Sequence, residues 1–375
     1  MGSTELKAGK KVLVSEFGQD PAEAIEKFMS LRDLDPPDPA ALKPGEVVIT
    51  IKSVAVSWVD VLMTSGQYQH MPSPPYCPGM EYSGVVSWTG ADVDPARVAI
   101  GDRVFADFFM VGPRSGGDYQ TSGGFASYAV VPAEAVRRIP GGFSFDQACC
   151  LLGNYETAYH CLIARGQLRA GETVLITGAS GSTGLATVQV AKLLGATVIA
   201  TGRSDAKLAV VKSEGADHVI NSKNADGASG VRRFRDEVKA LTGGRGVDVV
   251  YDAVGGDTSL ECMRCTAFGA RFLIVGWTST PFVAKGKGQR GAPNANLLPT
   301  NIIQMKGLSV LGCPAVIAVV NNPSMRAPRV AQIMEWVAQG RIKPYISRVY
   351  PLAEFKDAMR ARWNGEITGG CVLHP

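Results

Sequence analysis

The sequence predicts an α/β protein made of two domains, one rich in β-strands and one built on a parallel sheet. Its 375 residues are too many for one compact core, since single cores stop growing at roughly 250 to 300 residues. Short β-branched or aromatic runs bounded by Gly, Pro or Asp fill residues 1–145. From residue 146 onward, apolar strands alternate with amphipathic helices, a pattern typical of a parallel sheet covered on both faces.

Several runs in the N-terminal part are predicted to be strands. They are KKVLVSEFG (10–18), GEVVITIKSVAVS (45–57), SGVVSWTG (83–90), GDRVFADFF (101–109) and GGFASYAVVP (123–132). A long loop rich in Gly and Pro, VGPRSGGDYQTSGG, occupies residues 111–124. We therefore expect a β-rich domain over residues 1–145 with long connections.

The rest of the chain follows the pattern of a parallel sheet with a short C-terminal extension. A helical segment is predicted at 145–166, then strands at 173–178, 197–202, 218–221, 247–255, 270–276 and 308–312, with helices at 184–195, 205–215 and 232–241 and after Thr258. The last sixty residues predict helix 328–340, strand 345–352, helix 353–365 and strand 369–375. The expected domains are thus 1–145 and 146–316, with 317–375 returning to the first.

Composition argues against several classes of protein. Apolar residues at 46% and charged residues at 19% are ordinary for a folded globular chain. No run reaches the ~18 uninterrupted apolar residues needed to span a bilayer, and a net charge of +4 is no nucleic-acid signature. The N-terminus shows no apolar export segment, so we expect a cytoplasmic protein whose eight cysteines are free thiols. The four histidines show no metal-ligand spacing, so we expect no bound metal.

The strongest local signal is a glycine-rich turn between a strand and a helix, in TVLITGASGSTGLATVQVAKLLG. The turn runs from Gly178 through Gly181, Ser182 and Thr183 to Gly184. Gly181 lets the backbone approach a pyrophosphate, Gly184 lets the helix pack on the strand, and the helix N-terminus supplies N–H donors. We therefore predict a dinucleotide site here, the alternative being a plain tight turn.

The end of the next strand indicates which dinucleotide binds. An NAD-binding protein typically has an acidic residue there. This chain instead has Gly202, Arg203 and Ser204, with Lys207 one turn into the following helix. A guanidinium, a hydroxyl and an ammonium suit a 2′-phosphate, so NADPH is favoured. The alternative is that the two cations face solvent, with Asp205 close enough to offset them.

A single carboxylate, Glu81, lies between two glycines in PGMEYSG (78–84). Three roles are open for it from the local sequence alone: a metal ligand, a catalytic acid or base, or a residue that holds a turn.

The order of these parts resembles a known superfamily. The chain is similar to the medium-chain dehydrogenases/reductases and, within them, to the zinc-free quinone oxidoreductase (zeta-crystallin-like) family. The resemblance rests on GEVVITIKSVAVSWVDVLMTSGQY, PPYCPGMEYSGVV, GDRVFA, GGFASYAVVP, TAYHCL, GETVLITGASGSTGLATVQVAKLLGATVIAT, GVDVVYDAVGG and MKGLSVLG. It implies a Rossmann parallel-sheet cofactor domain plus a β-rich GroES-like catalytic domain, and a homodimer or tetramer.

The resemblance also implies that a zinc site has been lost. Zinc-dependent relatives place a cysteine where this chain has Ser57, and Gly-His-Glu where it has Gly79, Met80 and Glu81. A thioether and a neutral hydroxyl are poor substitutes for imidazole and thiolate on zinc. No cysteine lies between Cys77 and Cys149 to form the relatives' structural zinc lobe. Glu81 is then expected to hold the turn and hydrogen bonds near the pocket floor.

Without zinc, the resemblance implies reduction of an acceptor that is already electrophilic. NADPH would deliver hydride to a quinone or an α,β-unsaturated carbonyl, and the protein would supply a proton donor. Tyr68, in SGQY, matches a tyrosine beside the nicotinamide in these relatives, and a phenol is a dependable donor at neutral pH. The alternative for Tyr68 is a wall of the pocket. Two other functions stay open, an enoyl thioester reductase and a crystallin-like protein that binds NADPH without turnover.

Further positions are carried over from the resemblance. Ser57, Thr157, Gly276 and Trp277 match cofactor-contacting positions, and Asp60 matches the aspartate of an N-x-x-D pattern whose asparagine is Ser57 here. Tyr155 is expected either to reach the pocket or to pack in the core. In the long polar loop that follows Trp277, the basic side chains are candidates for the phosphates of an acyl thioester: Lys285, Lys287 and Arg290.

Overall fold

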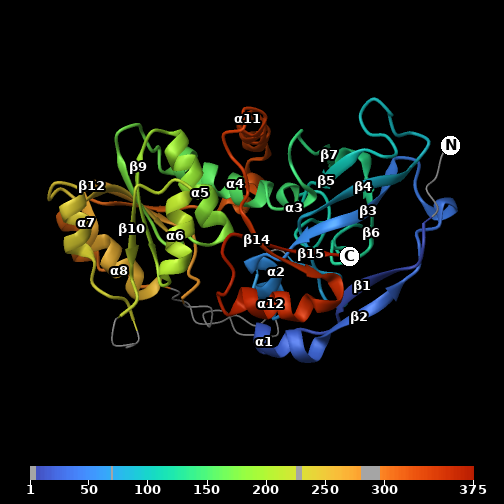
Figure 1. The fold of residues 1–375 in the computed structure, drawn as a ribbon, viewed down its shortest axis with the longest axis horizontal. Helices are drawn as coiled ribbons and strands as arrows, with labels where there is room; N and C mark the ends of the chain where they lie inside the picture. The colour runs from blue at the N-terminus through green and yellow to red at the C-terminus, as the bar shows by residue number, and fades with distance from the viewer. Residues whose placement is uncertain (1–5, 69–70, 225–229, 280–295) are drawn as a thin grey trace. The chain divides into compact units, whose positions relative to one another are not determined.

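The computed structural model describes residues 6–68, 71–224, 230–279 and 296–375. Contacts between Cα atoms divide the chain into two compact units. Within the described residues, unit 1 is formed by residues 6–68, 71–153 and 344–375, and unit 2 by residues 154–224, 230–279 and 296–343. In Figure 1 the colour along the chain shows that unit 1 joins the blue N-terminal part to the red C-terminal end.

Unit 1 is built on a largely antiparallel sheet. Its strands run in the order β14, β15, β3, β4, β5, β7, with β6 pairing with β3, and β1 and β2 form a separate ribbon. The strands are β1 (Gly9–Val14), β2 (Met29–Leu34), β3 (Glu46–Ala55), β4 (Tyr82–Thr89), β5 (Arg103–Ala106), β6 (Tyr128–Pro132), β7 (Val136–Arg138), β14 (Ile346–Pro351) and β15 (Gly370–His374). The helices of this unit are α1 (Pro21–Glu23), α2 (Trp58–Met63), α3 (Phe145–Ala148) and α12 (Phe355–Trp363). The N-terminal runs predicted as strands all form strands here.

The C-terminal segment Pro344–Pro375 belongs to unit 1 and contributes two strands to its sheet. Strand β15 pairs antiparallel with β3, with Val372 opposite Ala55. Arg362 of α12 is buried and donates to the carbonyl oxygens of Val56 at 2.9 Å and Gly369 at 3.0 Å. These bonds fix helix α12 beside the end of β3, where α2 begins.

Unit 2 contains a six-stranded sheet in which every pair of neighbours is parallel. The strand order is β10, β9, β8, β11, β12, β13, the doubly wound Rossmann order in which the sheet grows both ways from β8 and β11. The strands are β8 (Thr173–Ile176), β9 (Thr197–Gly202), β10 (His218–Asn221), β11 (Val247–Asp252), β12 (Thr266–Ile274) and β13 (Ser309–Gly312). Strand β13 lies at the edge, so LSVLG completes the sheet as predicted.

Unit 2 contains the helices α4 (Leu152–Tyr159), α5 (Ser182–Leu193), α6 (Asp205–Ser213), α7 (Arg235–Leu241), α8 (Gly256–Cys265), α9 (Thr300–Lys306), α10 (Ala315–Asn321) and α11 (Arg326–Ala338). Of these, α5, α6, α7 and α8 lie beside the sheet in Figure 1. One core cluster joins Leu175, Ile199 and Phe272 of the strands to Phe234 and Cys262 at α7 and α8. The central strands β8 and β11 are almost entirely buried because both faces of the sheet are covered there.

The two units divide the chain at residues that differ from the predicted domain boundaries. The expected boundaries were 145/146 and 316/317, whereas the contacts place the divisions at 153/154 and 343/344. The difference at the second boundary is due to α11, which packs on α4 in unit 2. The rings of Tyr159 and Trp336 lie 5.9 Å apart between these helices, and Lys343 still donates to Gln189 of α5.

In the part of the chain that the structure describes, no helix combines the length and apolar character required to cross a membrane.

Candidate functional site

The predicted cofactor-binding residues of unit 2 gather at one edge of its sheet. Because the strands are parallel, their carboxyl ends meet at the same edge. Gly178 follows β8, Gly202 ends β9, and Gly276 follows β12. Strands β8 and β11 are the neighbours from which the sheet grows in opposite directions, the place where open α/β sheets bind ligands.

The glycine-rich turn has the backbone geometry of a phosphate-binding loop. Gly178 has a φ of +61°, in the left-handed region that favours glycine. A Cβ built on Gly184 would lie 2.3 Å from the Gly178 carbonyl oxygen, so helix α5 can pack this close only with glycine there. At Gly181 a Cβ would meet only that same oxygen, at 3.5 Å. Gly181 therefore keeps an open surface at the start of α5, and this cradle fits a dinucleotide.

Ser182 and Thr183 form the first turn of α5 and are half-buried. The Thr183 hydroxyl donates to the side-chain oxygen of Asn154 at 2.8 Å, which fixes its rotamer. The N-cap residue, Gly181, carries no side chain to cap the helix. The N-terminus of α5 thus presents backbone N–H groups and positive potential at the turn.

The residues predicted to recognise a 2′-phosphate lie at the end of β9. Arg203 is exposed, and within the described ranges no hydrogen bond or ion pair holds its side chain. Ser204 and Lys207 are half-buried at the start of α6. Asp205 accepts a hydrogen bond from Asn221 at 2.8 Å, so its carboxylate is engaged with β10. Arg203 is thereby left available to an anionic ligand.

A buried carboxylate at the end of β11, which sequence reasoning missed, holds the loop that follows this strand and the end of β8. Asp252 accepts from Thr177 Oγ1 at 3.0 Å and from the N–H groups of Val254 and Gly255 at 3.1 Å. Gly255 has a φ of +80°, and a Cβ there would lie 3.1 Å from Cα of Trp277. Asp252 and Gly255 therefore set the position of the Gly276–Trp277 segment. The position of Asp252 at the end of an apolar strand was the available signal.

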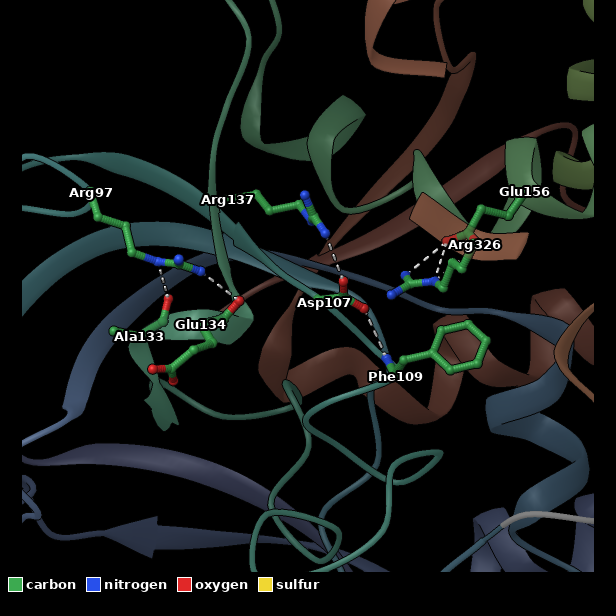
Figure 2. A network of polar contacts seen from close by, with 8 residues as sticks. All are labelled: Arg97, Asp107, Phe109, Ala133, Glu134, Arg137, Glu156 and Arg326. Atoms are coloured by element: carbon green, nitrogen blue, oxygen red, sulfur yellow. Dashed lines mark hydrogen bonds and ion pairs between the residues drawn. The ribbon is translucent and has the colours of Figure 1, made fainter. Parts of the chain in front are cut away.

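Thr157 is half-buried on α4, a helix tied firmly to α11. Arg326 donates to both carboxylate oxygens of Glu156, with its nearest contact at 2.8 Å (Figure 2). On the same helix, Tyr155 is buried and its hydroxyl donates to Gln189 at 2.6 Å. Of the two roles open for Tyr155, this bond favours core packing.

In unit 1, Ser57 and Asp60 form a reciprocal cap at the start of α2. Ser57 donates from its hydroxyl to Asp60 Oδ2 at 2.7 Å, and Asp60 N–H donates back to the Ser57 hydroxyl oxygen at 3.1 Å. The other carboxylate oxygen, Oδ1, accepts from the N–H groups of Gly79 at 3.1 Å and Met80 at 3.2 Å. Burial raises the pKa of the Asp60 carboxyl above its usual value, opposed by the hydrogen bonds from Ser57, Gly79 and Met80.

Glu81 caps a backbone group rather than facing open solvent. Its carboxylate accepts from the N–H of Gly153 at 2.8 Å, and its side chain is 8% exposed. A Cβ built on Gly153 would lie 2.5 Å from Glu81 Oε2. The carboxylate therefore packs against Gly153 within unit 1, in agreement with a hydrogen-bonding role.

The candidate proton donor, Tyr68, is paired with a residue that sequence reasoning missed. The guanidinium of Arg114 donates to the Tyr68 hydroxyl oxygen at 2.5 Å. The same guanidinium lies over the Tyr68 ring, 5.2 Å from its centroid, and over Phe108, 5.5 Å from its centroid. Arg114 lies in an irregular loop far from Tyr68 in the sequence, so no local pattern could have indicated the pair.

Comparison with known proteins now identifies the family. A family model described as "Alcohol dehydrogenase GroES-like domain" matches residues 43–141, and one described as "Zinc-binding dehydrogenase" matches residues 182–317. The "Quinone oxidoreductase-like protein 2 homolog" of Nematostella vectensis is 30% identical over 373 residues, covering 99% of this chain and 90% of the relative. The chain belongs to the quinone oxidoreductase-like family of medium-chain dehydrogenases/reductases.

Other members of this family agree. The human protein named quinone oxidoreductase is 27% identical, with 99% of both chains covered. A solved structure of a probable oxidoreductase from Mycobacterium abscessus superimposes with a TM-score of 0.77 at 28% identity, covering 99% of this chain and all of that one. As a member of the quinone oxidoreductase-like family, the chain is an NAD(P)-dependent oxidoreductase with a GroES-like and a Rossmann-type part.

The side chains at the zinc-ligand positions of this quinone oxidoreductase-like protein do not fit zinc. The Ser57 hydroxyl is bound to Asp60, Met80 is a buried thioether, and Glu81 accepts from Gly153. Both oxygens of Asp60 already accept hydrogen bonds. Over residues 6–68, 71–224, 230–279 and 296–375, no group of three or more His, Cys, Asp or Glu side chains is arranged to hold a metal ion.

The structure brings the glycine turn, the end of β9 and the Gly276 turn together at one edge of the unit 2 sheet. It places Ser57 and Tyr68 in unit 1, and Thr157 on α4 of unit 2. The basic side chains suggested for an acyl thioester, Lys285, Lys287 and Arg290, lie outside the described residues.

Proposed function

We propose that this protein is an NADPH-dependent reductase that transfers hydride to a quinone or a reactive α,β-unsaturated carbonyl without a metal. The observation that carries the proposal is the network in which Asp60 accepts from the Ser57 hydroxyl and from the backbone N–H of Met80, the residues at two positions where zinc-dependent relatives carry ligands. An acceptor that is already electrophilic needs a positioned hydride donor and a proton donor, and no metal to ionise an alcohol.

The proposed cofactor is NADPH rather than NADH. Bound nicotinamide supplies the hydride. The open surface at Gly181 and the N-terminus of α5 support binding of the pyrophosphate. Arg203, exposed and available at the end of β9, with Ser204 and Lys207 beside it, supports recognition of the 2′-phosphate. Thr157, Gly276 and Trp277 are proposed to complete the cofactor contacts, together with Ser57.

Tyr68 is the proposed proton donor to the oxygen of the reduced acceptor. Tyr68 is half-buried, and a phenol O–H is a hydrogen-bond donor. Proton donation to a developing oxyanion lowers the barrier without any change in how the acceptor binds. A pocket-wall role would instead change the binding of acceptor and cofactor.

An acceptor panel tests the proposal. Oxidation of NADPH and of NADH is followed with an ortho-quinone, an enone and a crotonyl thioester. We expect turnover with the quinone or the enone and NADPH, and a fall in kcat of about 100-fold in Tyr68→Phe. Turnover of the thioester alone would identify an enoyl thioester reductase. NADPH binding without turnover of any acceptor would show a crystallin-like binding protein, and either result would overturn the proposal.

A homodimer is proposed from the edge of the unit 2 sheet. In the described part of the chain, β13 pairs only with β12 and so has one open edge. Beside it, Phe268 is 84% exposed and Met305 is 73% exposed, an unusual display of large apolar side chains. Light scattering should give twice the monomer mass, and Phe268→Asp should shift the protein toward monomer. A monomer in the wild type would contradict this assembly.

The proposed location is the cytoplasm. All eight cysteines are buried free thiols in the structure, a state that a reducing compartment preserves. Fractionation of the native host, with the protein followed by antibody, tests this location.

A further inference from the structure

The loop that carries Arg114 is held in place at several points. It follows β5, where Asp107 accepts from the N–H of Phe109 at 3.1 Å and pairs with Arg137 at 3.3 Å (Figure 2). The Ser115 hydroxyl donates to the Gly112 carbonyl oxygen at 2.8 Å, closing a turn around Arg114. Because hydrogen bonds hold both ends of this segment, the backbone places the guanidinium of Arg114 against Tyr68.

The chemistry of the pair sets the direction of its hydrogen bond. A guanidinium has five N–H donors and no acceptor, so the Tyr68 oxygen must accept from Arg114. The phenol hydrogen must then point away from Arg114. Among the described residues, no acceptor receives it. The Tyr68 hydroxyl therefore keeps a proton that no described residue accepts, and it can donate this proton to a bound molecule.

Two more polar atoms beside Tyr68 lack a protein partner. Nε of Arg114 and Oε1 of Gln67 are buried, and neither has a hydrogen-bond partner in the described residues. Buried polar atoms are nearly always paired, so a buried donor left over in this way indicates a ligand atom or water. The free N–H of Arg114 and the free O–H of Tyr68 are both donors, and donors suit an oxygen that carries negative charge.

We propose that Arg114 is a positioning residue for proton delivery by Tyr68, and that the pair recognises the oxyanion of the reduced acceptor. This inference rests on the proposed reductase function. Hydride reaches a carbon of the acceptor, and the displaced π-electron pair moves onto its carbonyl oxygen. The Tyr68 O–H bond then breaks and its proton bonds to that oxygen. The phenolate keeps the electron pair of the broken bond, is stabilised by the Arg114 guanidinium, and regains a proton from solvent water.

Arg114 could instead serve only to anchor the loop through its contacts with Tyr68 and Phe108. An anchoring role would lower the melting temperature and would affect catalysis equally with and without the Tyr68 hydroxyl. The positioning role predicts that the loss of Arg114 lowers kcat only when that hydroxyl is present.

The test uses a double-mutant cycle on the full chain with the best acceptor of the panel. Arg114→Ala should lower kcat by about 10- to 100-fold and change the Kd for NADPH by less than about 2-fold. In a Tyr68→Phe background the same substitution should have little further effect, because the two residues act as a unit. Guanidinium at a sub-denaturing concentration should restore part of kcat in Arg114→Ala and none in the double variant.

A matched control distinguishes the general effect of losing an arginine from the specific effect of losing Arg114. Arg97 is another arginine of unit 1, and it donates to the carbonyl oxygens of Ala133 and Glu134 (Figure 2). Arg97→Ala should leave kcat unchanged whatever it does to the melting temperature. If Arg114→Ala does not fold, Arg114→Lys, which keeps the charge and loses the planar fork, replaces it in the same cycle.

Failure of this inference can be distinguished from failure of the proposed function. Equal losses of kcat from Arg114→Ala with and without Tyr68, or wild-type kcat in Arg114→Ala, would overturn the inference while turnover itself stands. If the wild type turns over no acceptor, binding of 4-nitrophenolate, an oxyanion with its own absorbance, decides the matter. If the affinity for 4-nitrophenolate falls in both Arg114→Ala and Tyr68→Phe, the result supports the oxyanion site. If neither substitution changes this affinity, the inference is overturned.

Discussion

Ser57 and Asp60 cap the same end of helix α2 through a reciprocal set of hydrogen bonds, with the Ser57 hydroxyl 2.7 Å from Asp60 Oδ2. The second oxygen of Asp60 holds the N–H groups of Gly79 and Met80. A single buried carboxylate therefore joins the start of α2 to the turn that carries Glu81.

Asp60→Asn should destabilise unit 1 although it changes the size of the side chain very little. An amide has one acceptor oxygen, so its NH2 group would face either the donors of Ser57 or those of Gly79 and Met80. Donors left unsatisfied in a buried site cost about 1–3 kcal/mol in the free energy of unfolding. Urea unfolding measures this, with Asp33→Asn, at an exposed pair with Lys10, as the control. Equal losses in the two variants would contradict the prediction.

Substitutions at Gly181 and at Gly184 should have different effects, the first on NADPH binding and the second on stability. Gly184→Ala should lower the melting temperature, because its Cβ would lie 2.3 Å from the Gly178 carbonyl oxygen. Gly181→Ala should leave the melting temperature unchanged and weaken NADPH binding by about 10-fold or more, because the added methyl group occupies the surface offered to the pyrophosphate. NADPH fluorescence titration and thermal unfolding measure the two effects. Unchanged affinity in Gly181→Ala would place the pyrophosphate elsewhere.

Arg203→Ala should change the preference between cofactors. A charge-assisted hydrogen bond to a phosphate is worth roughly 1.5–3 kcal/mol, so the Kd for NADPH should rise about 10- to 100-fold. The Kd for NADH, which lacks the phosphate, should not move. Arg169→Ala is the matched control, since Arg169 is also exposed but precedes β8 at the opposite end of the strand from the glycine turn. A parallel rise for both cofactors would argue against 2′-phosphate recognition.

His160 should make stability depend on pH. It is 2% exposed, and burial lowers the pKa of its imidazole to about 4, with Arg329 adding to the effect. Because the unfolded chain binds the proton first as the pH falls below about 6.5, stability falls between that pH and about 4. The loss amounts to about 3 kcal/mol for this one group. Urea midpoints at pH 7 and pH 4.5 should differ less in His160→Asn than in the wild type.

The control for that measurement is His218→Gln, which removes a half-buried histidine of β10 in the same unit. If the two histidine variants respond to pH as the wild type does, the loss of stability in acid has another source.

Sequence predicted the parts of the fold that are set by local constraints. The turn from Gly178 to Gly184 was identified because the need for glycine at these positions follows from the local strand–turn–helix sequence. The central apolar strands of unit 2 were identified because both faces of a parallel sheet are buried there, and LSVLG forms the edge strand β13.

Relationships between distant segments could not be predicted in the same way. The hydrogen bonds from Gly79 and Met80 to Asp60 and the contact of Arg114 with Tyr68 join loops whose approach depends on the whole sheet of unit 1. The amphipathic pattern of α11 indicates that this helix packs against another part of the chain, but it does not indicate which unit. Asp252 was overlooked because one of its partners, Thr177, follows a strand that is distant in the sequence.

The network around Asp60 also determines how this protein could be re-engineered. Changing Ser57 to cysteine would remove the hydroxyl that Asp60 accepts from, and changing Met80 to histidine would place an imidazole on a backbone segment that Asp60 holds. The cysteine alone would weaken the network before any metal could bind, because the bond from the Ser57 hydroxyl to Asp60 would be lost, whereas the backbone N–H at position 80 would remain. Positions 57 and 60 therefore have to be redesigned together, and installing the zinc ligands one at a time would pass through a less stable intermediate.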